Sequence, residues 1–313
     1  MSKIKEFIKN ISPLNNRTEM PVILYIIKII IIFGFVKFGS ELIGEAFAIG
    51  IHFVCGKNPL NGEMFDGRTI LLITYYGYAL MIGVLILYWK LFQKKTLAGL
   101  GFNRKFGSYF AGAAIGAVLA VASVFAVMLT GTLTYNGVFS NIDYTYIVLM
   151  FGGFVFQGAL EEVLCRGIVL QLLKEKTSIP VAVGISTALF VIPHISNMSE
   201  ADPAIIVFAV AGLIIISLIF SALTLRFNSI WAACGLHSVW NFILYNILGL
   251  NLSGNDELTA AVFDMKSVGS NILNGGVYGI EASVVTAAVL ILALVLICAV
   301  SARGHKNSLI KLS

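Results

Sequence analysis

The sequence has few charged residues, few prolines and few cysteines for its length. Charged side chains make up 12% of the 313 residues, about half the share that is usual in soluble domains. The six prolines and four scattered cysteines, with no CxxC pair, exclude a collagen-like chain and a disulfide framework and argue against a thiolate metal site. Composition therefore excludes an ordinary soluble globule and the usual small disulfide scaffolds.

Apolar residues take the place of the missing charges. They make up 58% of the chain, and the mean hydropathy is +0.92. They occur in runs of about 18 residues or more, which is typical of membrane-spanning helices. We therefore predict an all-α fold, a polytopic transmembrane helical bundle with about eight spans. The predicted spans are 20–38, 67–90, 107–132, 145–172, 179–194, 204–225, 229–247 and 279–301.

The basic residues indicate how these spans are oriented. The net charge of +5 could suggest a nucleic-acid partner, but the lysines and arginines lie at the ends of the apolar runs, so we expect no nucleic acid. The predicted outer loops at 133–144, 195–203 and 248–278 are acidic and contain a single lysine, Lys266. By the positive-inside rule, the N- and C-termini are both cytoplasmic.

The predicted organisation is one transmembrane domain with short ends. Residues 1–19 form a cytoplasmic or interfacial segment, either an amphipathic helix on the inner leaflet or a solvated basic tail. Residues 20–301 form a single transmembrane domain, and 302–313 form a cytoplasmic tail. Residues 39–54 either extend the first helix or fold back at the outer surface.

Three charged residues lie inside the predicted span 145–172, where each would cost roughly 2.5–3.5 kcal/mol if it were alone. Glu162 and Arg166 stand four residues apart in the favoured acid-first order, so they can neutralise each other on a helix. Glu161 points about 100° away from Glu162, and Cys165 rather than a cation stands four residues after it. Glu161 is therefore the candidate for chemistry, and the other two are candidates for a supporting ion pair.

Two further polar motifs lie in later spans. His194 follows Pro193, which can kink the helix and free a backbone carbonyl, while His237 and Asn241 lie one turn apart on one helix face. At 1.5 Å per residue, Glu161, His194 and His237 lie roughly 18, 22 and 12 Å from the cytoplasmic ends of their spans. Antiparallel packing can therefore bring the three side chains into one layer roughly 10 Å thick.

These polar residues also have a structural interpretation, because a lone intramembrane histidine or asparagine often holds two helices together by a hydrogen bond. Among known chemistries, the sequence lacks the HExxH of zincins, the GxGD of intramembrane aspartyl proteases, and a GxSG with a downstream histidine. What remains is a set of one glutamate, two histidines and one asparagine.

The three motifs, in this order, are those of a known family. Glu161 to Arg166 fit EExxxR, Phe190 to His194 fit FxxxH, and His237 to Asn241 fit HxxxN. The chain thus resembles the CPBP family of intramembrane proteases, which includes type II CAAX prenyl endopeptidases and bacteriocin-processing or Abi-type proteins. The resemblance covers about residues 145–247 and implies a catalytic core there.

The resemblance implies a role for each motif residue. Glu161 and His194 would activate a water molecule, His237 and Asn241 would stabilise the oxyanion, Glu162 and Arg166 would support Glu161, and Phe190 would pack the site wall. The family pattern favours a glutamate-dependent reaction with no cofactor. A zinc ion held by Glu161, His194 and His237 is the alternative, since two histidines and a carboxylate can form a catalytic zinc site.

The function predicted from these residues is an intramembrane endopeptidase that cuts a hydrophobic or lipidated peptide or protein. Its partners are then that substrate and the lipid bilayer, and its expected location is a bacterial plasma membrane. One alternative is a non-enzymatic immunity or regulatory protein that binds a partner through the same cavity. Another is a proton-coupled carrier, although the sequence shows no repeated halves. No residue indicates an oligomeric state.

Overall fold

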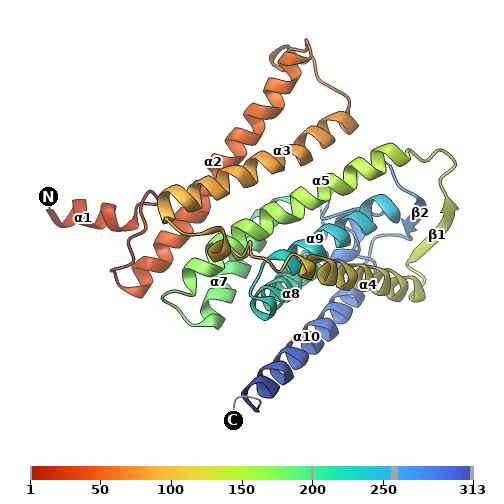
Figure 1. The fold of residues 1–313 in the computed structure, drawn as a ribbon. Helices are drawn as coiled ribbons and strands as arrows, with labels where there is room; N and C mark the ends of the chain where they lie inside the picture. The colour runs from red at the N-terminus through yellow and green to blue at the C-terminus, as the bar shows by residue number, and fades with distance from the viewer. Residues whose placement is uncertain (1, 199–200, 255–259, 311–313) are drawn as a thin grey trace. The chain divides into compact units, whose positions relative to one another are not determined.

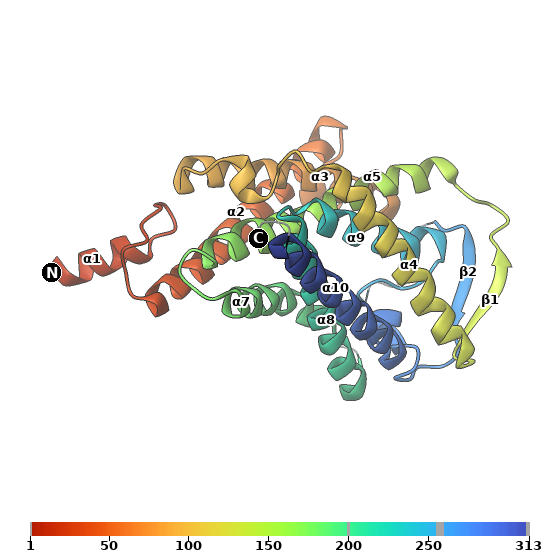
Figure 2. The ribbon, with the colours of Figure 1, turned by 60° about the horizontal axis from the view of Figure 1, so that its bottom comes forward.

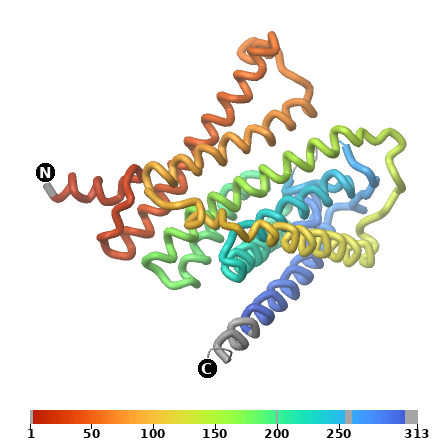
Figure 3. Tube along the Cα trace, in the orientation of Figure 1, coloured from red at the N-terminus to blue at the C-terminus, as the bar shows by residue number. Residues whose placement is uncertain are grey.

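A computed structural model describes residues 2–198, 201–254 and 260–310, with the side chains described for 3–198, 201–254 and 260–302. Figure 3 traces the backbone. The chain divides into two compact units, one formed by residues 1–104 and 152–189 and the other by 105–151 and 190–313. Each unit is described by itself. The prediction of a single transmembrane domain over 20–301 stays a prediction.

The first unit is built around a long helix pair. Helix α2 (Val22–Val54) and helix α3 (Gly67–Tyr88) lie side by side (Figure 1). Helix α2 continues without a break through residues 39–54, so this segment extends the first span and does not fold back. Helix α3 begins where the Asp66 carboxylate accepts a hydrogen bond from the Thr69 N–H at 3.1 Å, which is a standard helix N-cap.

Shorter elements complete the first unit. They are α1 (Ser2–Ile11), a π-helical turn at Trp89–Gln93, the later part of α5 (Tyr144–Glu162), a π-helical segment at Val163–Val169, α6 (Leu170–Leu173), and α7 (Ile179–Val191) up to Leu189. The α1 segment is helical, with Ile4, Phe7 and Ile8 exposed. Its placement on the inner leaflet remains a prediction.

A buried stripe on α2 covers the segment that contains the acidic motif. Tyr25, Ile29, Ile32 and Val36 recur every three or four residues and are almost completely buried, as expected for one face of a helix. Helix α2 contacts both Val163–Val169 and α6. The Tyr25 hydroxyl donates a hydrogen bond to the Leu172 carbonyl at 3.0 Å. The first predicted span therefore forms part of the support for the acidic motif.

The second unit packs four helices in pairs. Helix α4 (Gly107–Leu129) lies along α9 (Trp231–Phe242), and α8 (Pro203–Phe227) lies along α10 (Val284–Ile310) (Figure 2). The α4–α9 contact is very close. A Cβ atom added at Gly112 would lie 1.8 Å from the Ala232 carbonyl oxygen, and a Cβ atom added at Gly235 would lie 2.1 Å from the backbone carbonyl oxygen of Tyr109. Glycine at these positions lets the two backbones touch, as in other membrane helix pairs.

The predicted outer loops contain strands that the sequence did not indicate. Strands β1 (Leu133–Val138) and β2 (Phe263–Ser267) form an antiparallel pair. Asn274 is fully buried nearby and donates hydrogen bonds to the carbonyls of Thr132, Val268 and Gly269 at 3.0–3.3 Å. Residues 199–200 and 255–259, which belong to predicted outer loops, lie outside the described residues.

The predicted fold class is confirmed. Within the described part of the chain, seven helices are long and apolar enough to cross a bilayer. The predicted span at 229–247 is present as α9 followed by a π-helical turn, Ile243–Ile247, with 12 and 5 residues. It falls slightly short of the ~20 residues of a full crossing. Helix α10 continues past residue 301 to Ile310, and residues 311–313 of the predicted tail lie outside the described residues. The cytoplasmic orientation of the termini remains a prediction.

Candidate active site

The acidic motif lies where α5 changes from an α-helix to a π-helix. Glu161 and Glu162 are the last two residues of α5, and Val163–Val169 follow as a π-helical segment. Our prediction assumed a regular α-helix through this stretch. π-helical turns in longer helices occur frequently at functional sites because the wider turn changes which side chains share a face.

The predicted ion pair between Glu162 and Arg166 forms in the first unit. Arg166 Nη1 lies 3.0 Å from Glu162 Oε1, and both side chains are 0% exposed. Because charges removed from water need a partner of opposite sign, each of these residues makes the burial of the other tolerable. The pair therefore neutralises two buried charges in the helical segment that begins directly after Glu161.

Glu161 has a different environment from its neighbour. It is half-buried rather than fully buried, and its Oε1 accepts a hydrogen bond from Gln157 Nε2 at 2.5 Å. Gln157 was not among the predicted site residues, although its position four residues before Glu161 places it on the same helix face. The amide orients one carboxylate oxygen of Glu161.

A hydrogen bond from a neighbouring helix secures the π-helical segment. Ser186 of α7 donates from its hydroxyl to the Cys165 carbonyl at 2.8 Å, and both residues are buried. Gly167 lies against the Leu100 carbonyl, where a Cβ atom would come within 3.0 Å. Carbonyl groups left over by an irregular helix need such donors, so α7 holds the acidic motif in place within its unit.

His194 lies in the second unit and is held by its own backbone. Helix α7 ends at Val191, and a 3-10 helix, Ile192–Met198, contains Pro193 and His194. Pro193 provides no N–H to the preceding turn, and His194 Nδ1 lies 2.8 Å from the Phe190 carbonyl oxygen. A carbonyl accepts only a donated hydrogen, so Nδ1 carries the proton in the neutral ring and Nε2 carries the lone pair.

His237 and Asn241 lie on α9, are both 6% exposed, and belong to the same unit as His194. The Phe190 ring is close to both histidines, with its centroid 5.0 Å from that of His194 and 6.2 Å from that of His237. Phe220 of α8 stacks on His237 with the centroids 4.8 Å apart and the rings 18° from parallel. The structure thus brings Phe190, His194 and His237 into one cluster, and Asn241 lies one turn further along α9.

Besides Gln157, three further kinds of site-supporting residue were not predicted from the sequence. Phe220 lies in an apolar run that contains no polar motif. The Glu281 carboxylate accepts hydrogen bonds from Trp240 Nε1 at 3.0 Å and from the Ser253 N–H and hydroxyl at 2.8 Å, so it ties the loop region to α9. Of these three kinds, only the glycines of α4 could have been found from the sequence, since Gly112 and Gly116 form a GxxxG pattern.

The predicted zinc alternative depends on where the possible metal ligands lie. Among the described residues, no group of three or more histidine, cysteine, aspartate or glutamate side chains that could hold a metal ion occurs. Glu161 belongs to the first unit, whereas His194 and His237 belong to the second. The predictions about a cofactor therefore stay predictions.

Comparisons with known proteins find a family that the central part of the chain resembles. Residues 143–243 match the family model described as type II CAAX prenyl endopeptidase Rce1-like. No curated protein and no solved structure matched the chain. The matched segment contains all three motifs that carried the resemblance to the CPBP family. Over residues 143–243 this integral, multi-pass membrane protein is therefore similar to a family of proteases, and the resemblance predicted from its motifs is confirmed.

Proposed function

We propose that this protein is an intramembrane endopeptidase that hydrolyses a peptide bond in a hydrophobic or lipidated peptide or protein, at a bacterial plasma membrane. The observation that carries the proposal is the position of the motifs, since Glu161, His194, His237 and Asn241 all lie within the segment that matches the CAAX endopeptidase family. The partners are then the substrate and the lipid bilayer, without nucleic acid.

In this proposal Glu161 is the general base. Its half-buried carboxylate, with one oxygen oriented by Gln157, takes a proton from a water molecule, whose oxygen then attacks the carbonyl carbon of the scissile bond. Glu162 is excluded from this role because it is fully buried against Arg166. When the tetrahedral intermediate collapses, the C–N bond breaks and the leaving amine receives the proton from Glu161.

His194 helps to orient and activate the same water. Its Nδ1–H is committed to the Phe190 carbonyl, so Nε2 can accept a hydrogen bond from the water. Fixing the tautomer in the resting enzyme means that no proton has to be rearranged before the reaction.

His237 and Asn241 are the proposed donors to the oxyanion. Both side chains are buried, and the stacked Phe220 ring limits the motion of the His237 imidazole. Donors that are fixed and largely removed from water stabilise a developing negative charge more than the same donors would in solvent. Asn241 provides an N–H donor but is a poor zinc ligand, which favours the reaction without a metal ion.

The test uses the purified full-length protein in proteoliposomes with a quenched fluorescent farnesylated CaaX peptide, and the same peptide without the lipid. Replacing a general base commonly lowers the rate by about 10²–10⁴, so Glu161→Gln and His194→Ala should lower kcat by such factors while Tm stays close to wild type. Glu45→Gln, which changes an exposed carboxylate in α2, is the matched control and should keep full activity.

Other outcomes separate the alternatives. Loss of activity with 1,10-phenanthroline, restored by Zn²⁺, would support the zinc set instead of the metal-free reaction. Rescue of a deletion phenotype by Glu161→Gln would support a binding or immunity function. If no peptide is cut, comparing the peptides of membranes with and without the Glu161→Ala protein would identify the natural substrate.

A further inference from the structure

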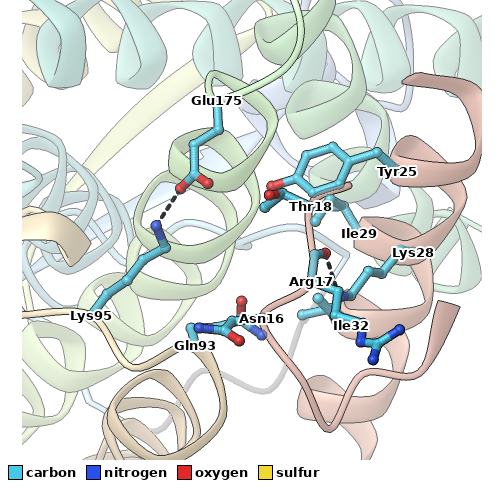
Figure 4. A pocket seen from close by; sticks show the side chains of 10 residues that line it. All are labelled: Asn16, Arg17, Thr18, Tyr25, Lys28, Ile29, Ile32, Gln93, Lys95 and Glu175. Atoms are coloured by element: carbon cyan, nitrogen blue, oxygen red, sulfur yellow. Dashed lines mark hydrogen bonds and ion pairs between the residues drawn. The ribbon is translucent and has the colours of Figure 1, made fainter. Parts of the chain in front are cut away.

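A small polar pocket lies in the first unit, away from the acidic motif. Figure 4 shows its lining, which comes from the segment before α2, the first turns of α2, the end of the π-helical turn after α3, and the loop after α6. The cavity has a volume of about 50 Å³. A single water needs about 10–15 Å³ on this measure, so the pocket accommodates a small polyatomic group such as a phosphate but not a peptide.

The charges around this pocket do not balance. Arg17, Lys28 and Lys95 line it, and the one acidic lining residue, Glu175, forms an ion pair with Lys95 at 2.7 Å. The Arg17 side chain is exposed and bonds the neutral amide of Asn10. The lining therefore contains three positive charges and one negative charge.

Lys28 is the residue that most requires an anion. Its side chain is almost completely buried, at 1% exposure. Its ammonium donates to Asn15 Oδ1 at 2.8 Å and to the Arg17 carbonyl at 2.9 Å, and both acceptors are neutral. Among the described residues, no carboxylate forms an ion pair with it. An ammonium has three donors, and a buried charge without a counter-charge is strongly unfavourable.

The position of the pocket indicates where an anion would come from. The segments that meet there contain Arg17, Lys95 and Lys176, and the positive-inside rule places these segments at the cytoplasmic surface of the bilayer. Anionic phospholipids are a feature of that surface, and basic pockets at the cytoplasmic ends of membrane helices commonly bind their headgroups. Ile29 and Ile32 provide an apolar wall beside the charged groups.

We propose that this pocket is a binding site for a phosphate group, supplied by the headgroup of an anionic phospholipid of the cytoplasmic leaflet. The phosphate oxygens accept hydrogen bonds from the Lys28 ammonium, and the positive charge of Arg17, which also lines the cavity together with Thr18, attracts the phosphate. Bound lipid would neutralise Lys28 and hold the segment before α2 against the loop after α6. The proposal is independent of the proteolytic function.

The test is native mass spectrometry of the full-length protein after removal of endogenous lipid. The probes are dioleoyl phosphatidylglycerol, dioleoylglycerol with the same chains but no phosphate, and inorganic phosphate. We expect phosphatidylglycerol to be retained, dioleoylglycerol not to be retained, and inorganic phosphate to compete. If inorganic phosphate binds and phosphatidylglycerol does not, the lipid source is wrong. If neither binds, the site is wrong.

Amino-acid substitutions test whether the lipid binds in this pocket. A hydrogen bond to a charged group contributes enough that Lys28→Met should weaken phosphatidylglycerol retention about tenfold or more. Arg17→Gln changes an exposed side chain and should fold normally while also weakening retention. Lys90→Met removes an exposed lysine that does not line the pocket and should bind like wild type. Equal retention by wild type, Arg17→Gln and Lys28→Met would overturn the proposal.

Discussion

Replacing Gly112 of α4 by alanine should separate α4 from the helix that carries His237. The added Cβ atom would lie 1.8 Å from the Ala232 carbonyl oxygen, and the carbonyl carbon and Cα of the same residue would be 2.6 and 2.8 Å away. All three are backbone atoms, so no flexible side chain can move aside. The helices themselves must shift.

The size of the shift follows from the contact distances. Cβ atoms essentially never lie closer than 3.0 Å to such neighbours, so α4 and α9 must separate by about 1.2 Å at this point. Overpacking of this kind typically costs about 1–3 kcal/mol, and the backbone contact places Gly112→Ala at the upper end. Because α9 carries His237 and Asn241, misplacing them by about 1 Å should also lower kcat by about 10²-fold.

The assay combines thermal unfolding in detergent with peptide cleavage. Gly116→Ala is the graded comparison, since its Cβ atom would lie 2.7 Å from the Leu236 oxygen and needs only a small adjustment. Gly34→Ala is the control, because nothing lies within 4 Å of its added atom and alanine favours a helix. We expect the Tm of Gly34→Ala to be the highest of the three, that of Gly116→Ala to be lower, and that of Gly112→Ala to be the lowest. A Gly112→Ala protein as stable and active as wild type would refute the close helix contact.

Three further changes test other parts of the structure. Glu162→Gln leaves the Arg166 cation buried and should cost about 3–5 kcal/mol, measured as a large fall in Tm. Asn274→Ala removes a fully buried side chain that donates three hydrogen bonds, so it should cost about 1–3 kcal/mol and increase proteolysis of the loop region. The hydrogen bonds from Thr69 lower the pKa of Asp66, so the cap is present above the ordinary Asp pKa of about 3.9 and is lost as pH falls through the lowered value. The protection of the amides at the start of α3, measured as the exchange rate relative to the intrinsic rate at each pH, should therefore fall in acid in wild type and stay unchanged in Asp66→Asn.

The sequence predicted the parts of this protein that depend on local pattern. The long apolar runs predicted the membrane spans, because a helix that crosses a bilayer requires a continuous apolar stretch. The four-residue spacing gave the Glu162–Arg166 pair, which the structure contains. The same helical geometry separated Glu161 from its neighbour, and the structure shows Glu161 half-buried with a neutral amide donor.

Contacts between distant segments could not be predicted from such local sequence patterns. Phe220 stacks on His237 from another helix, and any apolar residue of α8 would have suited the span equally well. Glu281 bonds Trp240 across 41 residues, and β1 pairs with β2 across a separation of about 130 residues. Such pairings depend on how helices and loops pack, whereas hydropathy indicates only whether a segment is surrounded by lipid or by water.

The buried ion pair also shows why composition points toward the site. A buried salt bridge is often no more stabilising than apolar residues of the same size, because the cost of removing both charges from water offsets their attraction. Glu162 and Arg166 are 0% exposed, so stability alone gives little reason to place them in a membrane helix. Glu162 is the last residue of α5, and Arg166 lies in the π-helical segment that follows it. Their place directly after Glu161 is therefore the reason why we expect these two charges to support Glu161 in the proposed reaction.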